Sequence, residues 1–319
     1  MAIVGHAVEG DTFRSAVLAD RLHHAWLLTG PEGVGKATFA RAAALWMLAY
    51  AAEPEPVGEG FAVPSDHRVS HLFHAGSHPD FRILRRLTKE KSEDLARSIS
   101  IDQVRTLQPM FATSPSLSPR RVVLIDAVDD LERGGANALL KNLEEPPAGT
   151  IFLLVSHAPG RLLPTIRSRC RLLRFSGLEE AESAQVLRAA LPESDAGEIA
   201  ALARIAAGAP GQALRFAGLD IAALDQAIDR LAREGDPTGV QRLVLAKQLS
   251  GKASQARYEA FLERAPGRIA ASAREGGDIA HKVALWTQAR SIADGAVRLS
   301  MDAQTTVFEV AGLLAKLRA

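Results

Sequence analysis

Residues 25–37 read AWLLTGPEGVGKA, and this stretch decides the fold. An apolar run of strand length comes first, glycines interrupt it, and an alanine-rich helical pattern follows. Between a strand and a helix, the spacing G-x-x-x-x-G-K predicts a phosphate loop. Its glycines, Gly30, Gly33 and Gly35, let backbone N–H groups curl around phosphate oxygens, and Lys36 can reach the terminal phosphates of a nucleotide.

The last position of this loop departs from the pattern. A Ser or Thr there normally supplies the hydroxyl that binds Mg²⁺, and Ala37 has none. Thr38 follows, but one step along a helix turns a side chain by about 100°, so Thr38 does not take over the metal position without rearrangement. The candidate nucleotide-binding residues of the loop are Gly30, Gly33, Gly35, Lys36 and Thr38. The sequence leaves open whether ATP or ADP occupies this degenerate site, or whether the segment is a glycine-rich turn with a solvated lysine.

Strand and helix patterns alternate through about residue 175. Further apolar runs lie at 81–84 (FRIL), 121–126 (RVVLID) and 150–156 (TIFLLVS), which predicts a parallel sheet with crossover helices. The later patterns are helical, with breaks near 208–211, 235–237, 251 and 266–267. We predict an α/β phosphate-loop domain at 1–176, a small helical domain at 177–218 and an all-helical domain at 219–319.

The run at 121–126 ends in a carboxylate, Asp126, as expected of the aspartate that helps hold Mg²⁺ beside a phosphate loop. An active ATPase also needs a group that orients the attacking water. The next residue, Ala127, can neither orient water nor accept a proton. Asp129 lies where a short helix begins, and we interpret it as a helix cap. Because phosphoryl transfer depends on positioning and charge stabilisation, the missing hydroxyl and carboxylate predict nucleotide binding without turnover.

Composition describes an ordinary globular chain of 319 residues. Lys and Arg total 38 against 37 for Asp and Glu, so the net charge of +1 gives no global field that marks a nucleic-acid or membrane binder. A single cysteine, Cys170, cannot form an internal disulfide. The N-terminal residues show no secretory signal pattern and no apolar run is long enough to span a bilayer, so we expect the cytoplasm as the compartment and no membrane partner.

Three further motifs follow the acidic strand in order: NALLKNLEEPP at 137–147, FLLVS at 152–156 and PTIRSRC at 164–170. Together with the phosphate loop and Asp126, this order resembles the clamp-loader branch of the AAA+ proteins. The resemblance is strong over residues 5–175, including Gly5 and His6, and covers the later helices only in outline. It implies an AAA+ α/β domain, a small helical lid and a C-terminal all-α collar domain that holds the loader's subunits together.

Within that branch, motor subunits keep three features that are absent here. These are the hydroxyl missing at Ala37, the glutamate missing at Ala127, and the lid arginine called sensor 2, whose place Gly211 takes. This profile, with AGSHPD at 75–80, resembles the delta-prime subunits of bacterial DNA polymerase III. The resemblance implies a role in ATP-dependent loading of the sliding clamp during DNA replication, as a component of the polymerase holoenzyme without independent ATPase or polymerase activity. The implied partners are the motor subunits and the delta subunit and, through the complex, the clamp and primer-template DNA.

Arg169 is the residue on which this interpretation depends most. In the family, the arginine of Ser-Arg-Cys reaches across a subunit boundary to the γ-phosphate of ATP on a neighbour, which implies a catalytic role for Arg169 in trans. Arginine fingers in general raise rates by about 10³–10⁵, or about 4–7 kcal/mol of barrier. The alternative is a solvated surface arginine. Its neighbours in such a surface cluster would be Arg161, Arg167, Arg171 and Arg174.

Two other functions stay open. An active AAA+ ATPase would use Asp129 or Asp130 in place of the missing glutamate. A nucleic-acid-binding module would contact phosphates through the basic cluster around Arg169.

Subunits of this family usually carry four cysteines that bind Zn²⁺ just before the segment matching 75–80, and the single cysteine lies elsewhere, so we expect no zinc site of that kind. His67, His71, His74 and His78 remain, at spacings that place them on one face of a helix, where imidazoles can bind a metal. The alternative is a polar helix face with His78 beyond its end, because the residue before a proline avoids helical geometry. We interpret Cys170 as a packed residue and not as a nucleophile.

Overall fold

The computed structural model describes residues 3–53, 58, 60–88, 95–299 and 301–318. The chain divides into two compact units, one comprising 1–186 with 206–212 and the other 187–205 with 213–319. The three-domain division with boundaries after 176 and 218 stays a prediction. Among the helices that the structure describes, none combines the length and the apolar character needed to cross a membrane.

A five-stranded parallel sheet forms the centre of the first unit. Its strands are β1 (Ala25–Thr29), β2 (Phe81–Arg85), β3 (Arg121–Asp126), β4 (Thr150–Ser156) and β5 (Arg171–Arg174). Their order across the sheet is β2-β3-β4-β1-β5, and every neighbouring pair is parallel. The phosphate-loop strand β1 therefore lies between β4 and β5, with the acidic strand β3 on the far side of β4.

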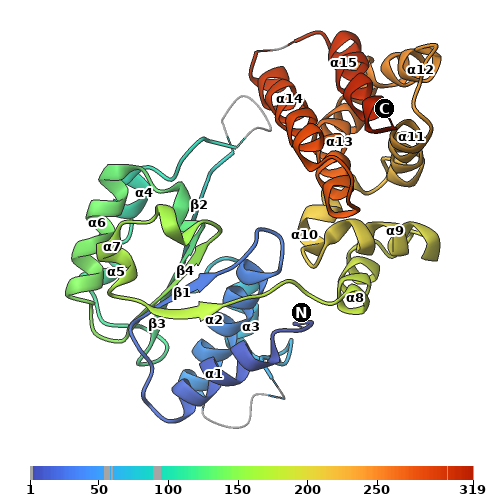
Figure 1. The fold of residues 1–319 in the computed structure, drawn as a ribbon. Coiled ribbons are helices and arrows are strands. Elements are labelled where there is room, and N and C mark those ends of the chain that lie inside the picture. Colours follow the sequence, from blue (N-terminus) through green and yellow to red (C-terminus); the bar gives the residue numbers. More distant parts are fainter. Residues whose placement is uncertain (1–2, 54–57, 59, 89–94, 300, 319) are drawn as a thin grey trace. The chain divides into compact units, whose positions relative to one another are not determined.

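Helices cover both faces of this sheet (Figure 1). One face carries α1 (Ala7–Leu18), α2 (Lys36–Ala52) and α3 (Arg68–His74), and the other carries α4 (Ile101–Arg105), α5 (Gln108–Phe111), α6 (Arg133–Glu144) and α7 (Pro164–Arg167). The central strands β1, β3 and β4 are buried on both faces, which is why their runs showed no alternation in the sequence.

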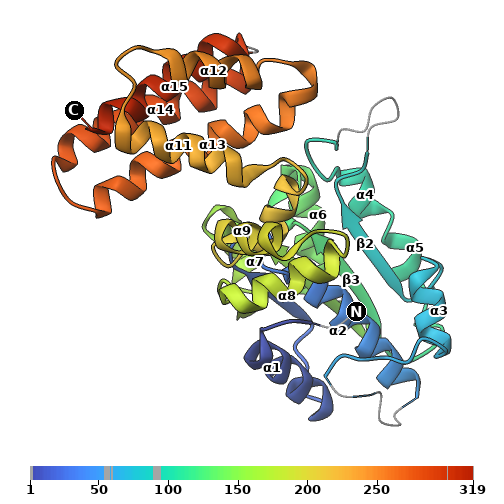
Figure 2. The same cartoon turned by 90° about the vertical axis from the view of Figure 1, so that its right-hand side faces the viewer.

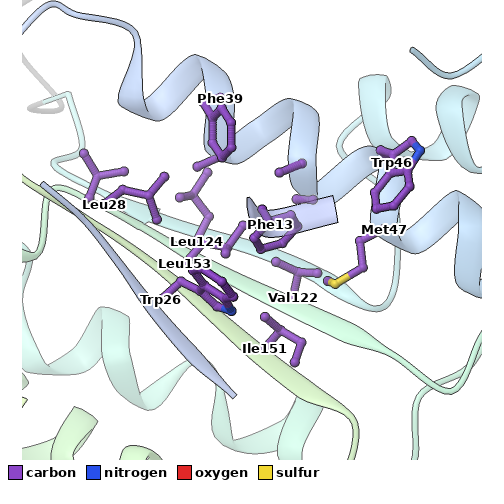
Figure 3. Packing of buried hydrophobic residues seen from close by; sticks show 14 of the residues in the cluster. Phe13, Trp26, Leu28, Phe39, Trp46, Met47, Val122, Leu124, Ile151 and Leu153 are labelled. Carbon is purple, nitrogen blue, oxygen red and sulfur yellow. The ribbon is translucent and has the colours of Figure 1, made fainter. Parts of the chain in front are cut away.

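Successive side chains of each strand enter opposite cores. Trp26 and Leu28 of β1 pack under α1 and α2, whereas Ala25 and Leu27 pack under α4 to α7. Figure 3 shows the first of these cores, where Phe13 of α1 meets Trp26 with ring centroids 5.2 Å apart. This packing fixes the orientation of β1, and therefore the place where the phosphate loop begins.

In the described residues after β5, every regular element is a helix. The α-helices are α8 (Glu180–Ala190), α9 (Ala196–Ala206), α10 (Pro210–Ala213), α11 (Ile221–Glu234), α12 (Val240–Leu249), α13 (Gln255–Arg274), α14 (Ile279–Arg298) and α15 (Ala303–Ala315). Helices α13, α14 and α15 pack against one another, and α11 packs against α13 and α15 (Figure 2). The predicted parallel α/β domain and the helical part that follows it are confirmed.

The predicted helix break at 266–267 is wrong, because α13 continues through Pro266. Pro266 is buried together with Ala265 and Ile269, on the side of α13 that packs against its neighbours. Burial of this apolar face outweighs the hydrogen bond that a proline removes from the helix. The predicted breaks near 235–237 and 251 are confirmed by the ends of α11 and α12.

Candidate functional site

The phosphate loop leaves the carboxyl end of β1 and places Lys36 at the first position of α2. Lys36 is 2% exposed, and its Nζ donates to the carbonyl oxygens of Gly30 at 2.6 Å and Pro31 at 2.5 Å. Burial lowers the pKa of Lys36 to about 8, against the opposing pull of Asp129 and Glu32. The ammonium group is therefore held inside the loop, where terminal phosphates would meet it.

The loop glycines adopt backbone conformations that other residues avoid. Gly30, Gly33 and Gly35 have φ angles of 148°, 82° and 104°. A Cβ on Gly30 would lie 2.2 Å from the carbonyl oxygen of Phe175, and one on Gly33 would lie 2.6 Å from the backbone nitrogen of Gln212. No atom lies within 4 Å of the Cβ position of Gly35 in the described chain, so the loop is open at the helix N-terminus. That open side is where backbone N–H groups can bind an anion.

Two other segments brace the loop through its carbonyl groups. The backbone N–H of Gly211 donates to the Gly33 oxygen at 2.8 Å, and Nε2 of His6 lies 2.9 Å from the Val34 oxygen. A Cβ on Gly211 would lie 2.9 Å from both the Cα and the oxygen of Gly33. The residue that we placed at the sensor 2 position thus contacts the phosphate loop directly, through its backbone.

Asp126 ends β3 at the same edge of the sheet as the loop. Burial raises the pKa of its carboxyl group, and the nearby His157 opposes that rise. A cavity of about 440 Å³ joins Asp126 and the buried Ala127 to Glu32 of the loop and to Arg85 at the end of β2. The structure therefore brings Asp126 and the phosphate loop to one polar cavity, with no carboxylate at position 127.

The interpretation of Asp129 as a helix cap is wrong. The short helical turn that contains it, Val128–Asp130, has no side-chain cap. The Asp129 carboxylate instead accepts from Oγ of Ser156 at 2.9 Å and from the backbone N–H groups of His157 at 2.7 Å and Ala158 at 3.3 Å. It holds the turn after β4, a contact between residues 27 to 29 positions apart that no local pattern reveals.

Position 37 supplies no hydroxyl for a metal ion. Ala37 packs against the hydrophobic core, and Thr38 is half-buried on α2, with no side-chain hydrogen bond among the described residues. Asp130 forms an ion pair with Arg86 at 3.1 Å. Both carboxylates that could replace the absent glutamate, Asp129 and Asp130, are thus held by other partners.

Arg169 lies at the opposite edge of the sheet, on the turn between α7 and β5. Its Nη2 lies 2.8 Å from Oε1 of Glu144, and its Nη1 donates to the Thr165 oxygen at 3.0 Å. About 34% of its side chain stays exposed. Sequence reasoning missed Glu144, although a carboxylate on the last turn of a helix before two prolines is an unusual feature that could have pointed to it.

Cys170 follows Arg169 directly, whereas Arg174 of the predicted basic cluster lies at the other end of β5. Burial raises the pKa of the Cys170 thiol to about 12, and its Sγ lies 3.1 Å from the Ile166 oxygen, as expected of a packed residue. The other members of the predicted cluster are exposed and are Arg161, Arg167, Arg171 and Arg174. The Arg171 guanidinium lies 4.8 Å from the centroid of the Trp26 ring.

The four histidines separate in the structure. His67 precedes α3, and its Nδ1 accepts from the backbone N–H of Val69 at 3.1 Å, while His71 and His74 are exposed. His78 lies beyond the helix end, as the second interpretation expected, and is buried. The described part of the chain contains no group of three or more side chains arranged to hold a metal ion.

Comparison with known proteins identifies the family of this chain. Residues 6–179 match the model of the family described as DNA polymerase III, delta subunit. The chain is 36% identical over 195 residues to DNA polymerase III subunit delta' of Pseudomonas aeruginosa, covering 61% of this chain and 56% of that protein. It is 35% identical over 196 residues to the Escherichia coli subunit delta', covering 61% and 55%.

A relative with a different name also matches. The chain is 32% identical over 173 residues to DNA polymerase III subunit tau of Bacillus subtilis, which covers 54% of this chain and 28% of that protein. The chain spans about half the length of the delta' relatives that it matches.

Proposed function

The chain belongs to the family described as DNA polymerase III, delta subunit, and from this membership we propose that it is a delta-prime-like subunit of a bacterial clamp loader. In this role it assists the ATP-dependent loading of the sliding clamp onto DNA in replication. It assembles with the motor subunits and the delta subunit in the cytoplasm, and it reaches the clamp and primer-template DNA through the complex. This placement agrees with the relatives named delta' and tau.

Its own phosphate loop binds nucleotide without turning it over. Lys36 and Asp126 supply the charges that a nucleotide and its metal need, which supports binding of ATP or ADP through the loop glycines and Thr38. Hydrolysis needs an aligned water, and the carboxylates of Asp129 and Asp130 are already bonded elsewhere. The alternative of an active ATPase is therefore the weaker one.

The observation that carries the proposal is the position of Arg169. Trp26 of β1 pairs with Arg171 of β5, so Arg169 is level with about residue 24, six residues before Gly30. At about 3.3 Å per residue this places Arg169 about 20 Å along the strand from its own phosphate loop. An arginine side chain does not span that distance, so the nucleotide it can stabilise is one bound to a neighbouring subunit. We therefore propose Arg169 as the catalytic residue of the chain, acting in trans.

The test is ATP hydrolysis by a loader reconstituted with Arg169→Ala. We expect the clamp- and DNA-stimulated rate at the neighbouring site to fall by about 10³ or more, in the range of other arginine fingers, while the complex still assembles. Arg167→Ala is the matched control, since Arg167 is an exposed arginine at the end of α7, two residues before Arg169. An unchanged rate with Arg169→Ala rules the role out, and equal losses in both variants point instead to general phosphate binding by the basic cluster.

A further inference from the structure

The proposed function assigns no role to the LEEPP segment at 143–147. Leu143 is buried and packs in the core beneath α6, and Glu144 is the last residue of that helix. Glu145 has φ −122° and ψ 74°, outside the helical region that the residue before a proline avoids. The segment thus ends α6 at a fixed place and leaves the Glu144 side chain about half exposed beside the turn that follows α7.

Glu144 and Thr165 hold Arg169 from two different elements. The carboxylate of Glu144 forms an ion pair with Nη2 at 2.8 Å, and the Thr165 carbonyl accepts from Nη1 at 3.0 Å. A guanidinium group has five N–H donors in a planar fork, so these two contacts leave part of the fork free. The plane of the fork is fixed while part of it stays accessible.

Stability does not explain a carboxylate at this position. The carboxyl end of a helix carries partial negative charge, which disfavours Glu144 there, and exposed ion pairs contribute little to folding. The carboxylate matters instead for what it does to Arg169, a long side chain that would otherwise sample many rotamers.

We propose that Glu144 is a positioning residue that fixes the Arg169 guanidinium in the orientation used on the neighbour's nucleotide. This inference rests on the proposed function of Arg169. With the fork held in place, less conformational freedom is lost when the γ-phosphate engages the remaining N–H groups.

The test uses Glu144→Ala in the reconstituted loader, with stimulated ATP hydrolysis as the readout. Without Glu144, the Arg169 side chain must be ordered when the transition state forms, and the free-energy cost of ordering a long side chain corresponds to a fall in kcat of about 2- to 10-fold. KM for ATP should stay unchanged, because Arg169 contacts the phosphate in the transition state. Glu144→Gln keeps a hydrogen-bond acceptor and should recover part of the loss. Glu145→Ala is the matched control, since Glu145 is exposed and forms no ion pair among the described residues; it should hydrolyse ATP like the wild type.

Thermal melting and a double variant separate the possible outcomes. Glu144→Ala should not lower Tm, because it removes a disfavoured charge and adds a good helix former. In an Arg169→Ala background it should cause no further loss, since the residue it positions is gone. Wild-type or raised turnover with Glu144→Ala, while Arg169→Ala is impaired, overturns the positioning role alone. If Arg169→Ala itself is unimpaired, the proposed function fails first.

Discussion

The contact between Gly211 and Gly33 makes a quantitative prediction for Gly211→Ala. The added Cβ would lie 2.9 Å from the Cα and the oxygen of Gly33, closer than real Cβ contacts come, and both of those atoms belong to the backbone. Neither can turn aside as a flexible side chain would. The phosphate loop or the start of α10 must shift, and the hydrogen bond from Gly211 N–H to the Gly33 oxygen must lengthen.

Overpacking of this kind costs about 1–3 kcal/mol. For a unit of about 190 residues, each kcal/mol lowers Tm by about 2–4 °C, so we expect a decrease of about 2–12 °C by calorimetry. Gly160→Ala is the matched control, because no atom lies within 4 Å of its Cβ position in the described residues and its φ is not positive. If Gly211→Ala has the same Tm as the control, the Gly211 segment does not pack on the phosphate loop as described.

Two other predictions concern titration and reactivity. Because the pKa of Lys36 is lowered to about 8, the ammonium group loses its proton as the pH rises through that value, and a fluorescent ATP analogue should bind more weakly at pH 9 than at pH 7. This difference should disappear in Lys36→Ala. Equal affinity of the wild type at the two pH values would contradict the prediction. The Cys170 thiol, with its pKa raised to about 12, should resist iodoacetamide at pH 8 in the native protein and react after unfolding, and rapid labelling of the native protein would contradict its burial.

The fold was predictable from short-range patterns. Strands buried on both faces give continuous apolar runs, and the phosphate loop marks the strand-to-helix turn, so the parallel sheet followed from residues close in sequence. Pro266 shows the limit of such patterns. Its local preference against helix is real, but packing around α13, which depends on distant residues, decides the outcome.

The sequence predicted where the candidate site lies in the fold, but it predicted few of the contacts between its residues. The phosphate loop and Asp126 meet at one edge of the sheet because parallel strands end there together, which the strand pattern implies. The bonds of Asp129 to the turn after β4, of Gly211 to Gly33, and of Glu144 to Arg169 join segments far apart in the chain. No spacing rule relates those residues, so only the folded chain reveals them.

The central claim is that this chain contributes to ATP hydrolysis through Arg169 and not through its own phosphate loop. The most direct measurement compares two reconstituted loaders, one with Arg169→Ala and one with Lys36→Ala, for clamp- and DNA-stimulated ATP turnover. The account predicts a large loss with Arg169→Ala and near-normal turnover with Lys36→Ala, provided that both complexes assemble. A loss with Lys36→Ala as large as that with Arg169→Ala, or full turnover with Arg169→Ala, would contradict it.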